Sequence, residues 1–204
     1  MKMGNNRSLT SVISQSINAK MSREDSEKVA FRLDDKESPS EVKSWISTGS
    51  TVLDLMVSNR KDGGLPSGRI VVLYGSSGSG KSLIASHVLA DCQQQGGISI
   101  FIDTEAAADF SFMQTIGIDP EGDFLYIAEN RLEKIFEMVE TIIEKHKERN
   151  ESDRPVAIVL DSIAGSVTEN EYEGTYGKEG YNTDKAIVLS KAMRKITGLI
   201  NRSE

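Results

Sequence analysis

The stretch GSSGSGKS, residues 75–82, decides the fold of this 204-residue chain. It matches the pattern G-x-x-x-x-G-K-[ST] in full, between an apolar run that predicts a strand, residues 70–74 (IVVLY), and a helix expected over residues 82–94. Glycines let backbone N–H groups turn inward around phosphate oxygens, and a helix N-terminus adds positive partial charge. The pattern predicts a phosphate-binding loop made of Gly75, Ser76, Ser77, Gly78, Ser79, Gly80, Lys81 and Ser82.

Further apolar runs outside this loop predict the rest of the architecture. Short, nearly continuous apolar runs are typical of strands buried on both faces of a parallel sheet. Helical patterns alternate with them along the chain. The expected fold class is therefore α/β, with a mostly parallel twisted sheet and helices on both faces. The strands are expected at residues 98–102, 124–128 and 156–160, and the helices at residues 107–116, 131–148 and 183–200.

Two acidic residues follow predicted strands. Asp161 ends the run VAIVLD, and with the Ser82 hydroxyl it could hold Mg²⁺, although a helix N-cap is the alternative. Glu105 follows the strand expected at residues 98–102 and could orient or deprotonate a water that attacks the γ phosphate. Lys81 would reach the β and γ phosphates of ATP as a point charge. Spacing alone leaves a capping role for Glu105 equally open.

Composition limits the class of protein. Apolar residues make up 38% of the chain and charged residues 27%, which suits a soluble domain with a packed core. No apolar run approaches the roughly 18 residues of a membrane span, and a single cysteine, Cys92, fits a reducing cytoplasm. The net charge of −7 argues against one broad basic face for nucleic acid. The segment from residue 178 to the end is nonetheless net positive, which a solvated helix face also explains.

The first 44 residues differ from the rest. Leu9, Val12, Ile13 and Ile17 recur at helical spacing, and residues 28–33 (KVAFRL) alternate enough for a strand. This segment has too few apolar residues for a core of its own. We therefore expect an arm, residues 1–44, that packs on the core, residues 45–204, or on a neighbouring subunit.

Four segments together resemble the RecA family of strand-exchange ATPases, which includes phage members. Residues 46–54 with 63–70 (GGLPSGRI) resemble its lead-in to the phosphate loop, and residues 101–105 (FIDTE) resemble its catalytic-glutamate segment. Residues 160–164 (LDSIA) resemble its magnesium-site strand, and residues 192–196 (AMRKI) the helix that follows. The resemblance covers about residues 28–202.

The resemblance implies a P-loop NTPase core that uses ATP and Mg²⁺, with Glu105 as general base. Asp109 and Phe112 fall where the family contacts and stacks on adenine. It also implies a filament on single-stranded DNA that pairs with double-stranded DNA. A first DNA-binding loop would lie at residues 169–180 and would include Tyr172, Tyr176 and Lys178. The strand that extends a neighbour's sheet would be Lys28, Val29, Ala30, Phe31, Arg32 and Leu33.

Departures from the family keep other functions open. The sequence of residues 56–61 (MVSNRK) departs from that of the family. The chain also stops at Glu204, before the family's γ-phosphate-sensing strand and second DNA-binding loop. One alternative is a non-hydrolysing module that binds nucleotide or a filament. Another is a helicase-type ATPase of the same fold. A small-molecule kinase is less favoured, because no basic cluster forms a lid over a second phosphate.

Overall fold

The computed structural model describes residues 8–21, 28–32, 35, 38, 41–149, 154–174 and 181–203, without the side chains of residues 181, 182 and 201–203. The chain forms two compact units, residues 1–41 and 42–204. Each unit is described by itself. No helix in the described ranges is long and apolar enough to cross a membrane.

The N-terminal unit contains the predicted amphipathic helix, α1 (Leu9–Met21), which is confirmed. The strand predicted at residues 28–33 is not formed over residues 28–32, and Leu33 lies outside the described residues. This segment is bonded instead to Asn18 of α1: its Oδ1 accepts the Val29 and Ala30 N–H groups at 3.0 and 2.8 Å, and its Nδ2 donates to the Ala30 carbonyl at 2.9 Å. These are backbone groups that a strand ladder would use.

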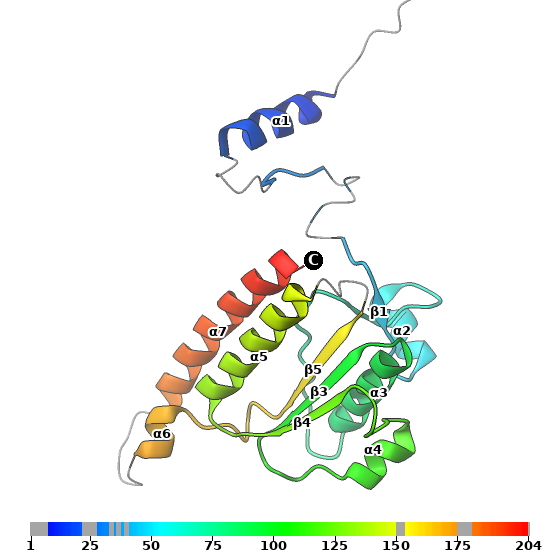
Figure 1. Cartoon of the computed structure of the whole chain (residues 1–204), viewed down its shortest axis with the longest axis vertical. Coiled ribbons are helices and arrows are strands. Elements are labelled where there is room, and N and C mark those ends of the chain that lie inside the picture. Colours follow the sequence, from blue (N-terminus) through cyan, green and yellow to red (C-terminus); the bar gives the residue numbers. More distant parts are fainter. Residues whose placement is uncertain are drawn as a thin grey trace, which may run out of the picture. The chain divides into compact units, whose positions relative to one another are not determined.

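A parallel three-stranded sheet is the centre of the second unit, in the order β4-β3-β5 (Figure 1). The strands are β3 (Ile98–Asp103), β4 (Phe124–Ala128) and β5 (Val156–Asp161), each within one residue of the prediction. The register pairs Asp103 with Asp161. The carboxyl ends of β3 and β5 therefore present their last side chains at the same edge of the sheet, where open α/β sheets bind ligands.

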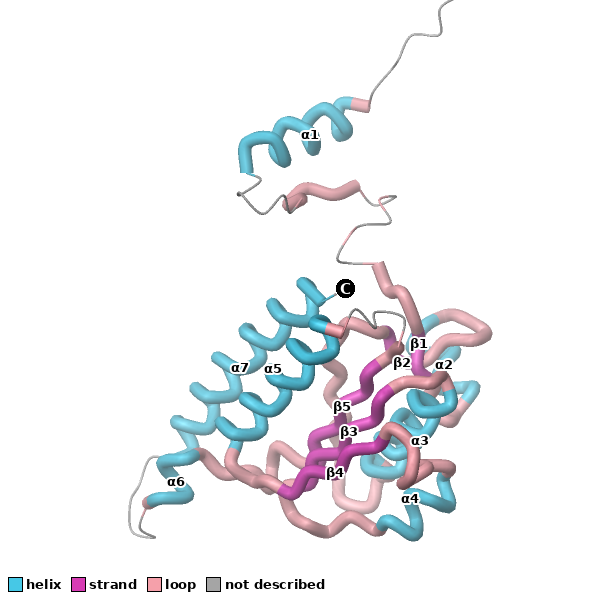
Figure 2. The backbone as a smooth tube through the Cα atoms, viewed as in Figure 1, coloured by secondary structure: helices cyan, strands magenta, loops and turns pink. Residues whose placement is uncertain are grey.

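Helices cover both faces of this sheet, as predicted (Figure 2). On one face α3 (Lys81–Gln94) packs against β3 and β5, with α4 (Phe110–Ile116) beside it. Leu89, Cys92, Phe101 and Met113 are buried there. On the other face α5 (Leu132–Glu148) packs its fully buried Ile135 on the sheet. The long helix α7 (Tyr181–Ser203) then packs on α5. Burial of both faces explains why the strand sequences are nearly continuous apolar runs.

A small lobe precedes the phosphate loop. It consists of β1 (Trp45–Ile46), α2 (Thr51–Ser58) and β2 (Leu65–Pro66), with β1 and β2 antiparallel. Buried Asp54 accepts hydrogen bonds from Ser47 Oγ and Thr48 Oγ1 at 2.5 and 2.6 Å. Burial raises the pKa of Asp54, but these hydrogen bonds outweigh it and hold the pKa below its ordinary value. These residues of the lead-in motif, which contributed to the resemblance, therefore stabilise the lobe through hydrogen bonds.

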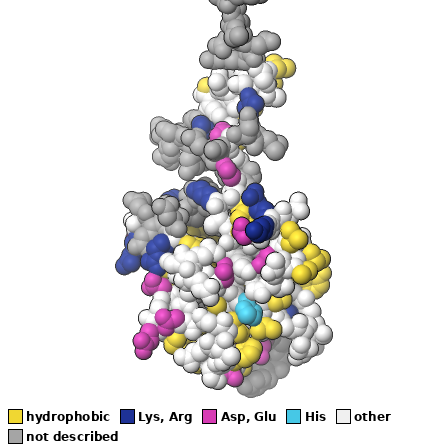
Figure 3. All heavy atoms as spheres, turned by 90° about the vertical axis from the view of Figure 1, so that its right-hand side faces the viewer, with side chains coloured by type: hydrophobic (Ala, Val, Ile, Leu, Met, Phe, Trp, Pro, Cys, Tyr) yellow, Lys and Arg dark blue, Asp and Glu magenta, His cyan; other side chains and the backbone are white. Residues whose placement is uncertain are grey.

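Hydrophobic side chains reach the surface of this lobe. On α2, Val52 is 70% exposed and Met56 is 78% exposed. Figure 3 views the side of the molecule that carries α2, and exposed hydrophobic side chains gather along one margin of that face.

The prediction of a strand at residues 70–74 is wrong. The run IVVLY forms no strand, and its residues are exposed, from 40% at Leu73 to 92% at Tyr74. A strand exists only through hydrogen bonds to a neighbour. β5 is the last strand of the sheet on its side, so no strand in the described part of the chain pairs with residues 70–74. Apolarity alone suggested a strand that has no partner here.

Candidate nucleotide-binding site

The predicted phosphate loop runs directly into α3. Gly80 is the N-cap of this helix with φ 89°, and Gly78 has φ 75°, so both occupy the left-handed region that glycine tolerates best. Gly80 has no side chain to cap the helix, and no side-chain cap bond is present. The N–H groups of the first turn, which have no partner within a helix, can therefore serve an anion.

The Lys81 ammonium lies over this loop. Its Nζ donates to the carbonyl oxygens of Gly75 and Ser76 at 3.1 and 2.8 Å. The positive charge of Lys81 is thus held next to the loop backbone that the sequence predicts to bind phosphates. Backbone carbonyls are weaker partners for an ammonium than a charged phosphate would be, so these contacts are exchangeable.

Ser82 and Asp161 are brought together as the sequence predicted. Ser82 Oγ donates to Asp161 Oδ2 at 2.6 Å, linking the first turn of α3 to the end of β5. A hydroxyl and a carboxylate are both hard oxygen ligands, and Mg²⁺ in phosphate sites uses one or two carboxylates together with substrate oxygens. This pair beside Lys81 and the helix N-terminus therefore fits Mg²⁺ bound to nucleotide phosphates.

Glu105 lies next to this pair. Ser162 Oγ donates to Glu105 Oε1 at 3.4 Å, a long contact. The neighbouring Thr104 hydroxyl donates to the Ser162 carbonyl at 2.9 Å and accepts its N–H at 3.0 Å. A Cβ on Gly165 would come within 2.7 Å of Glu105 Cγ. Sequence reasoning missed the roles of Ser162 and Gly165, and only the packing of two distant segments reveals them.

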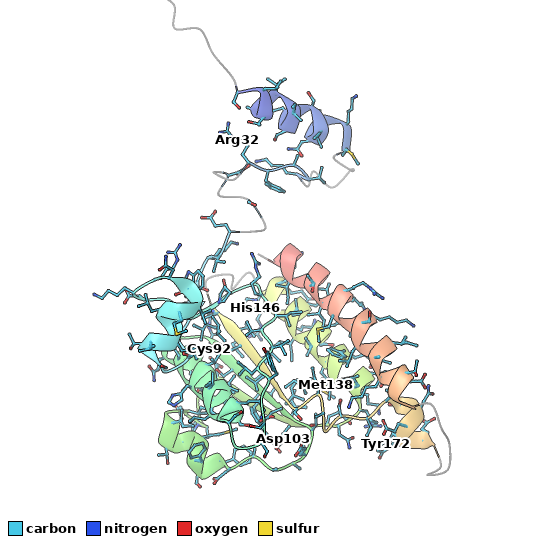
Figure 4. All side chains as sticks on the ribbon, turned by 180° about the vertical axis from the view of Figure 1, so that it is seen from behind. Arg32, Cys92, Asp103, Met138, His146 and Tyr172 are labelled. Atoms are coloured by element: carbon cyan, nitrogen blue, oxygen red, sulfur yellow. The ribbon has the colours of Figure 1, made fainter. Side chains whose placement is uncertain are left out.

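Buried Asp103 shapes the loop that carries Glu105. Its Oδ1 accepts the Glu105 N–H at 3.0 Å, and its Oδ2 accepts the Ala108 N–H at 2.9 Å and the Tyr126 hydroxyl at 3.1 Å. Burial, then the bond to Asp103, raises the pKa of Tyr126 above its ordinary value. Figure 4 labels Asp103 at the end of the sheet. The three bonds hold the start of the loop in one conformation.

Asp109 and Phe112 lie at the start of α4. Asp109 is the N-cap: its Oδ1 accepts the Phe112 N–H at 3.0 Å and the Ser111 hydroxyl at 2.6 Å. The Ser111 bond is the main cause of the lowered pKa of Asp109. This cap starts the helix at Phe110, three residues later than the sequence suggested. The Phe112 ring is 47% exposed and available for contact.

The remaining predicted residues belong to other elements or lie outside the described residues. Tyr172 lies on the short helix α6 (Glu169–Glu173), where its ring contacts Arg131, with 4.9 Å between the ring centroid and Arg131 Cζ. Tyr176 and Lys178 lie outside the described residues, as does Leu33. Residues 28–32 belong to the N-terminal unit.

Comparison with known proteins agrees with this geometry. The family model of the RecA N-terminal domain matches residues 12–204. The chain is 37% identical to Protein RecA of Campylobacter lari over 173 residues, 84% of this chain and 46% of that protein. It is 36% identical to Protein RecA of Wolinella succinogenes over 166 residues, 81% and 44% of the two chains. It thus spans less than half the length of these curated relatives. Since the family model covers almost all of its residues, the chain belongs to the RecA family.

Proposed function

We propose that this chain is the ATP-binding core of a DNA recombinase, which assembles on single-stranded DNA and promotes its pairing with a homologous duplex. The observation that carries the proposal is the bond between Ser82 and Asp161 beside a glycine loop at a helix N-terminus. Family membership supports a recombinase rather than another phosphate-loop enzyme.

In this proposal each residue of the site has one role. The loop N–H groups and the Lys81 ammonium bind the phosphates, and Lys81 exchanges its bonds to Gly75 and Ser76 for phosphate oxygens. Ser82 and Asp161 hold Mg²⁺, which when bound neutralises charge on the β and γ phosphate oxygens. Asp109 and Phe112 border the adenine, where the exposed Phe112 ring offers a stacking face.

Glu105 orients the attacking water and takes its proton. The Asp103 bonds to Glu105 and Ala108 fix the loop, and the Ser162 hydroxyl lies at one carboxylate oxygen, leaving the other for water. A general base needs this fixed geometry first, because proton transfer requires hydrogen-bond distance to the water. Thr104 ties the Glu105 segment to the residue that follows Asp161. Base and metal ligand would therefore keep one relative position.

The DNA and subunit contacts are proposed for the segments that the family resemblance indicates. Tyr172, 60% exposed, and residues 175–180 would meet single-stranded DNA. The apolar side of α1 and residues 28–33 would bind a neighbouring subunit. Leu9 is 74% exposed and Ile13 48% exposed, which leaves apolar surface for that contact.

A nucleotide-binding module without turnover is the second candidate. It is favoured by the exposed residues 70–74, because the loop's leading segment is then not held by the sheet. Such a loop could bind phosphates through α3 and still fail to hold the γ phosphate in line with water.

The test is Mg²⁺-dependent ATP turnover, with and without single-stranded DNA. Lys81→Ala and Glu105→Gln are the site variants. Lys145→Ala and Glu148→Gln are matched controls, since this exposed pair at the end of α5 is bonded at 2.6 Å away from the site. Turnover that rises with DNA and falls by roughly 10²-fold or more in both site variants supports the recombinase. Saturable ATP binding without turnover supports the second candidate, and no ATP binding contradicts both.

A further inference from the structure

The short helix α6 is bonded to the start of α5, on the side of the molecule away from α2 (Figure 1). It also contacts the first turn of α7, where Asn170 Nδ2 donates to Asp184 Oδ2 at 3.3 Å. Five residues are too few for a helix that is stable alone, so its position depends on what it packs against. Backbone bonds join the chain before α6 to the chain before α5. The Val167 N–H donates to the Asn130 carbonyl, and the Leu132 N–H donates to the Val167 carbonyl, both at 2.8 Å.

Arg131 makes the side-chain part of this junction. Its Nε and Nη2 donate to the two carboxylate oxygens of Glu129 at 2.9 and 2.7 Å, which fixes the plane of the guanidinium. Its Cζ lies 4.9 Å from the centroid of the Tyr172 ring, and its Nη1 lies 3.9 Å from Glu169 Oε1. The Arg131 side chain is only 22% exposed. One guanidinium thus links a fixed carboxylate with two residues of α6.

The charges around Arg131 make it difficult to replace. Glu129 lies on one side of the guanidinium and Glu169 on another, and the Glu169 N–H donates to a third carboxylate, Glu133, at 3.0 Å. No hydrogen bond within the described ranges reaches the buried Glu169 Oε2. Without the guanidinium these carboxylates would repel each other in a half-buried place, and α6 would move away from α5.

A charge alone would not hold α6 in this way. The bidentate contact with Glu129 needs a planar group, which lysine lacks, and the same guanidinium lies over the Tyr172 ring. Tyr172 remains 60% exposed although the guanidinium of Arg131 lies over its ring (Tyr172 is labelled in Figure 4). The junction therefore presents an aromatic ring to solvent in a fixed orientation. Fixed, exposed rings are what unpaired bases stack on.

We infer that Arg131 is a positioning residue for DNA binding: it docks α6 on the start of α5 and thereby orients Tyr172. The inference rests on the proposed function for the DNA contact, but the docking does not. Arg131 acts through α6 and has no part in the nucleotide site.

The test compares Arg131→Gln and Arg131→Lys in the full chain. Arg60→Gln is the matched control, because it removes another arginine that lies over an aromatic ring, Trp45, at 5.3 Å. Hydrogen exchange of residues 169–173 measures docking without DNA. We expect exchange roughly tenfold faster in Arg131→Gln and unchanged in Arg60→Gln. Unchanged exchange in Arg131→Gln would overturn the docking.

Anisotropy of a labelled oligo(dT) with Mg·ATP measures DNA affinity, and a fluorescent ATP analogue measures nucleotide affinity. Arg131→Gln is expected to weaken oligo(dT) binding roughly tenfold and to leave nucleotide affinity unchanged. Arg131→Lys should recover less than half of the loss, since it restores charge without planarity. Full recovery by lysine would mean that Arg131 acts only as a charge and would overturn its positioning role. If the wild-type chain binds ATP but no oligo(dT), the proposed function fails for DNA, and exchange alone decides whether Arg131 docks α6.

Discussion

Ser82 on the first turn of α3 and Asp161 at the end of β5 are joined by a hydrogen bond of 2.6 Å between Oγ and Oδ2, although 79 positions separate them in the sequence. Each oxygen alone is an ordinary polar group at the end of an element. Together they place two hard oxygen ligands at the point where the phosphate loop enters its helix. This relationship is the part of the site on which the magnesium proposal depends.

Removing either oxygen should remove the magnesium dependence of nucleotide binding. Asp161→Asn keeps a polar side chain beside Ser82 but loses the charge, and Ser82→Ala loses the hydroxyl. We expect the apparent Mg²⁺ affinity of the nucleotide complex to fall roughly 10- to 100-fold in both. Titration of a fluorescent ATP analogue with Mg²⁺ or with chelator measures this.

Ser86→Ala is the control for that experiment. Its hydroxyl lies one turn further along α3 and donates to the Ser82 backbone carbonyl at 2.8 Å, so it tests the helix without touching the Ser82 hydroxyl or the Asp161 carboxylate. It should keep the wild-type Mg²⁺ dependence. Equal Mg²⁺ dependence in wild type, Asp161→Asn and Ser82→Ala would show that the two residues form only a structural bond.

Gly165 leaves no room for a side chain beside the proposed base. A Cβ there would lie 2.7 Å from both Glu105 Cγ and Thr104 Oγ1, so Gly165→Ala must push the Glu105 side chain away. A displacement of about 1 Å can cost roughly 10²-fold in rate, and we expect that loss in ATP turnover with little change in ATP affinity. Steady-state turnover together with equilibrium nucleotide binding separates the two effects.

Gly198→Ala is the matched control for this substitution. Gly198 lies within α7, and a Cβ there meets nothing within 4 Å. Alanine should raise the free energy of unfolding by about 0.5–1 kcal/mol, because glycine is the more flexible residue in a helix, and turnover should not change. Wild-type turnover in Gly165→Ala would contradict the position proposed for Glu105.

The sequence was sufficient where one local pattern determines an element. β3, β4 and β5 lie within one residue of their predicted ends, because a strand buried on both faces must be apolar along its length. The sequence also predicted that Ser82 and Asp161 would lie close together, because the topology of a parallel sheet positions both the loop and the end of the strand. Residues 70–74 have the same apolar pattern, but no strand in the described ranges lies beside them, and composition does not reveal pairing.

Contacts between distant segments could not be predicted. The docking of α6 depends on Arg131, and the space around Glu105 depends on Gly165; neither residue belongs to a periodic pattern or a motif with known spacing. Asp109 shows a third limit. Its side chain caps α4 and shortens that helix, whereas the resemblance suggested only an adenine contact.

The exposed run at residues 70–74 leads to a prediction about self-association. Val72 is 66% exposed in a segment with high strand propensity that pairs with no strand among the described residues, and such a segment is a template for pairing between molecules. Val72→Lys should reduce self-association in sedimentation or light scattering and change the free energy of unfolding by less than about 0.5 kcal/mol. Ile100→Ala, at a site 2% exposed, should cost about 2–5 kcal/mol. A comparable cost for Val72→Lys would mean that this run is buried as a strand.

The contact between Glu129 and Arg131 leads to a prediction about how the stability of the fold depends on pH. The Arg131 side-chain hydrogen bond is the main cause that lowers the pKa of Glu129 from 4.5 to about 2. The folded chain therefore binds this proton more weakly than the unfolded chain does. The resulting stabilisation is present above pH 4.5 and is lost as the pH falls towards 2. Glu129 is only 13% exposed, and the lowered pKa corresponds to a total contribution of roughly 3 kcal/mol at most.

Urea unfolding of wild type and Glu129→Gln between pH 3 and 6 measures this contribution. Glutamine does not titrate, so the variant should be less stable at pH 6, and its free energy of unfolding should fall less steeply below pH 4.5, by up to about 1.4 kcal/mol per pH unit. The two curves should therefore converge as the solution becomes acidic. Glu148→Gln, which removes an exposed carboxylate 63% open to solvent, controls for the loss of one surface charge and should run parallel to wild type. Curves for wild type and Glu129→Gln that stay parallel would mean that Arg131 does not hold Glu129 in solution, and the docking of α6 would then lose its fixed anchor.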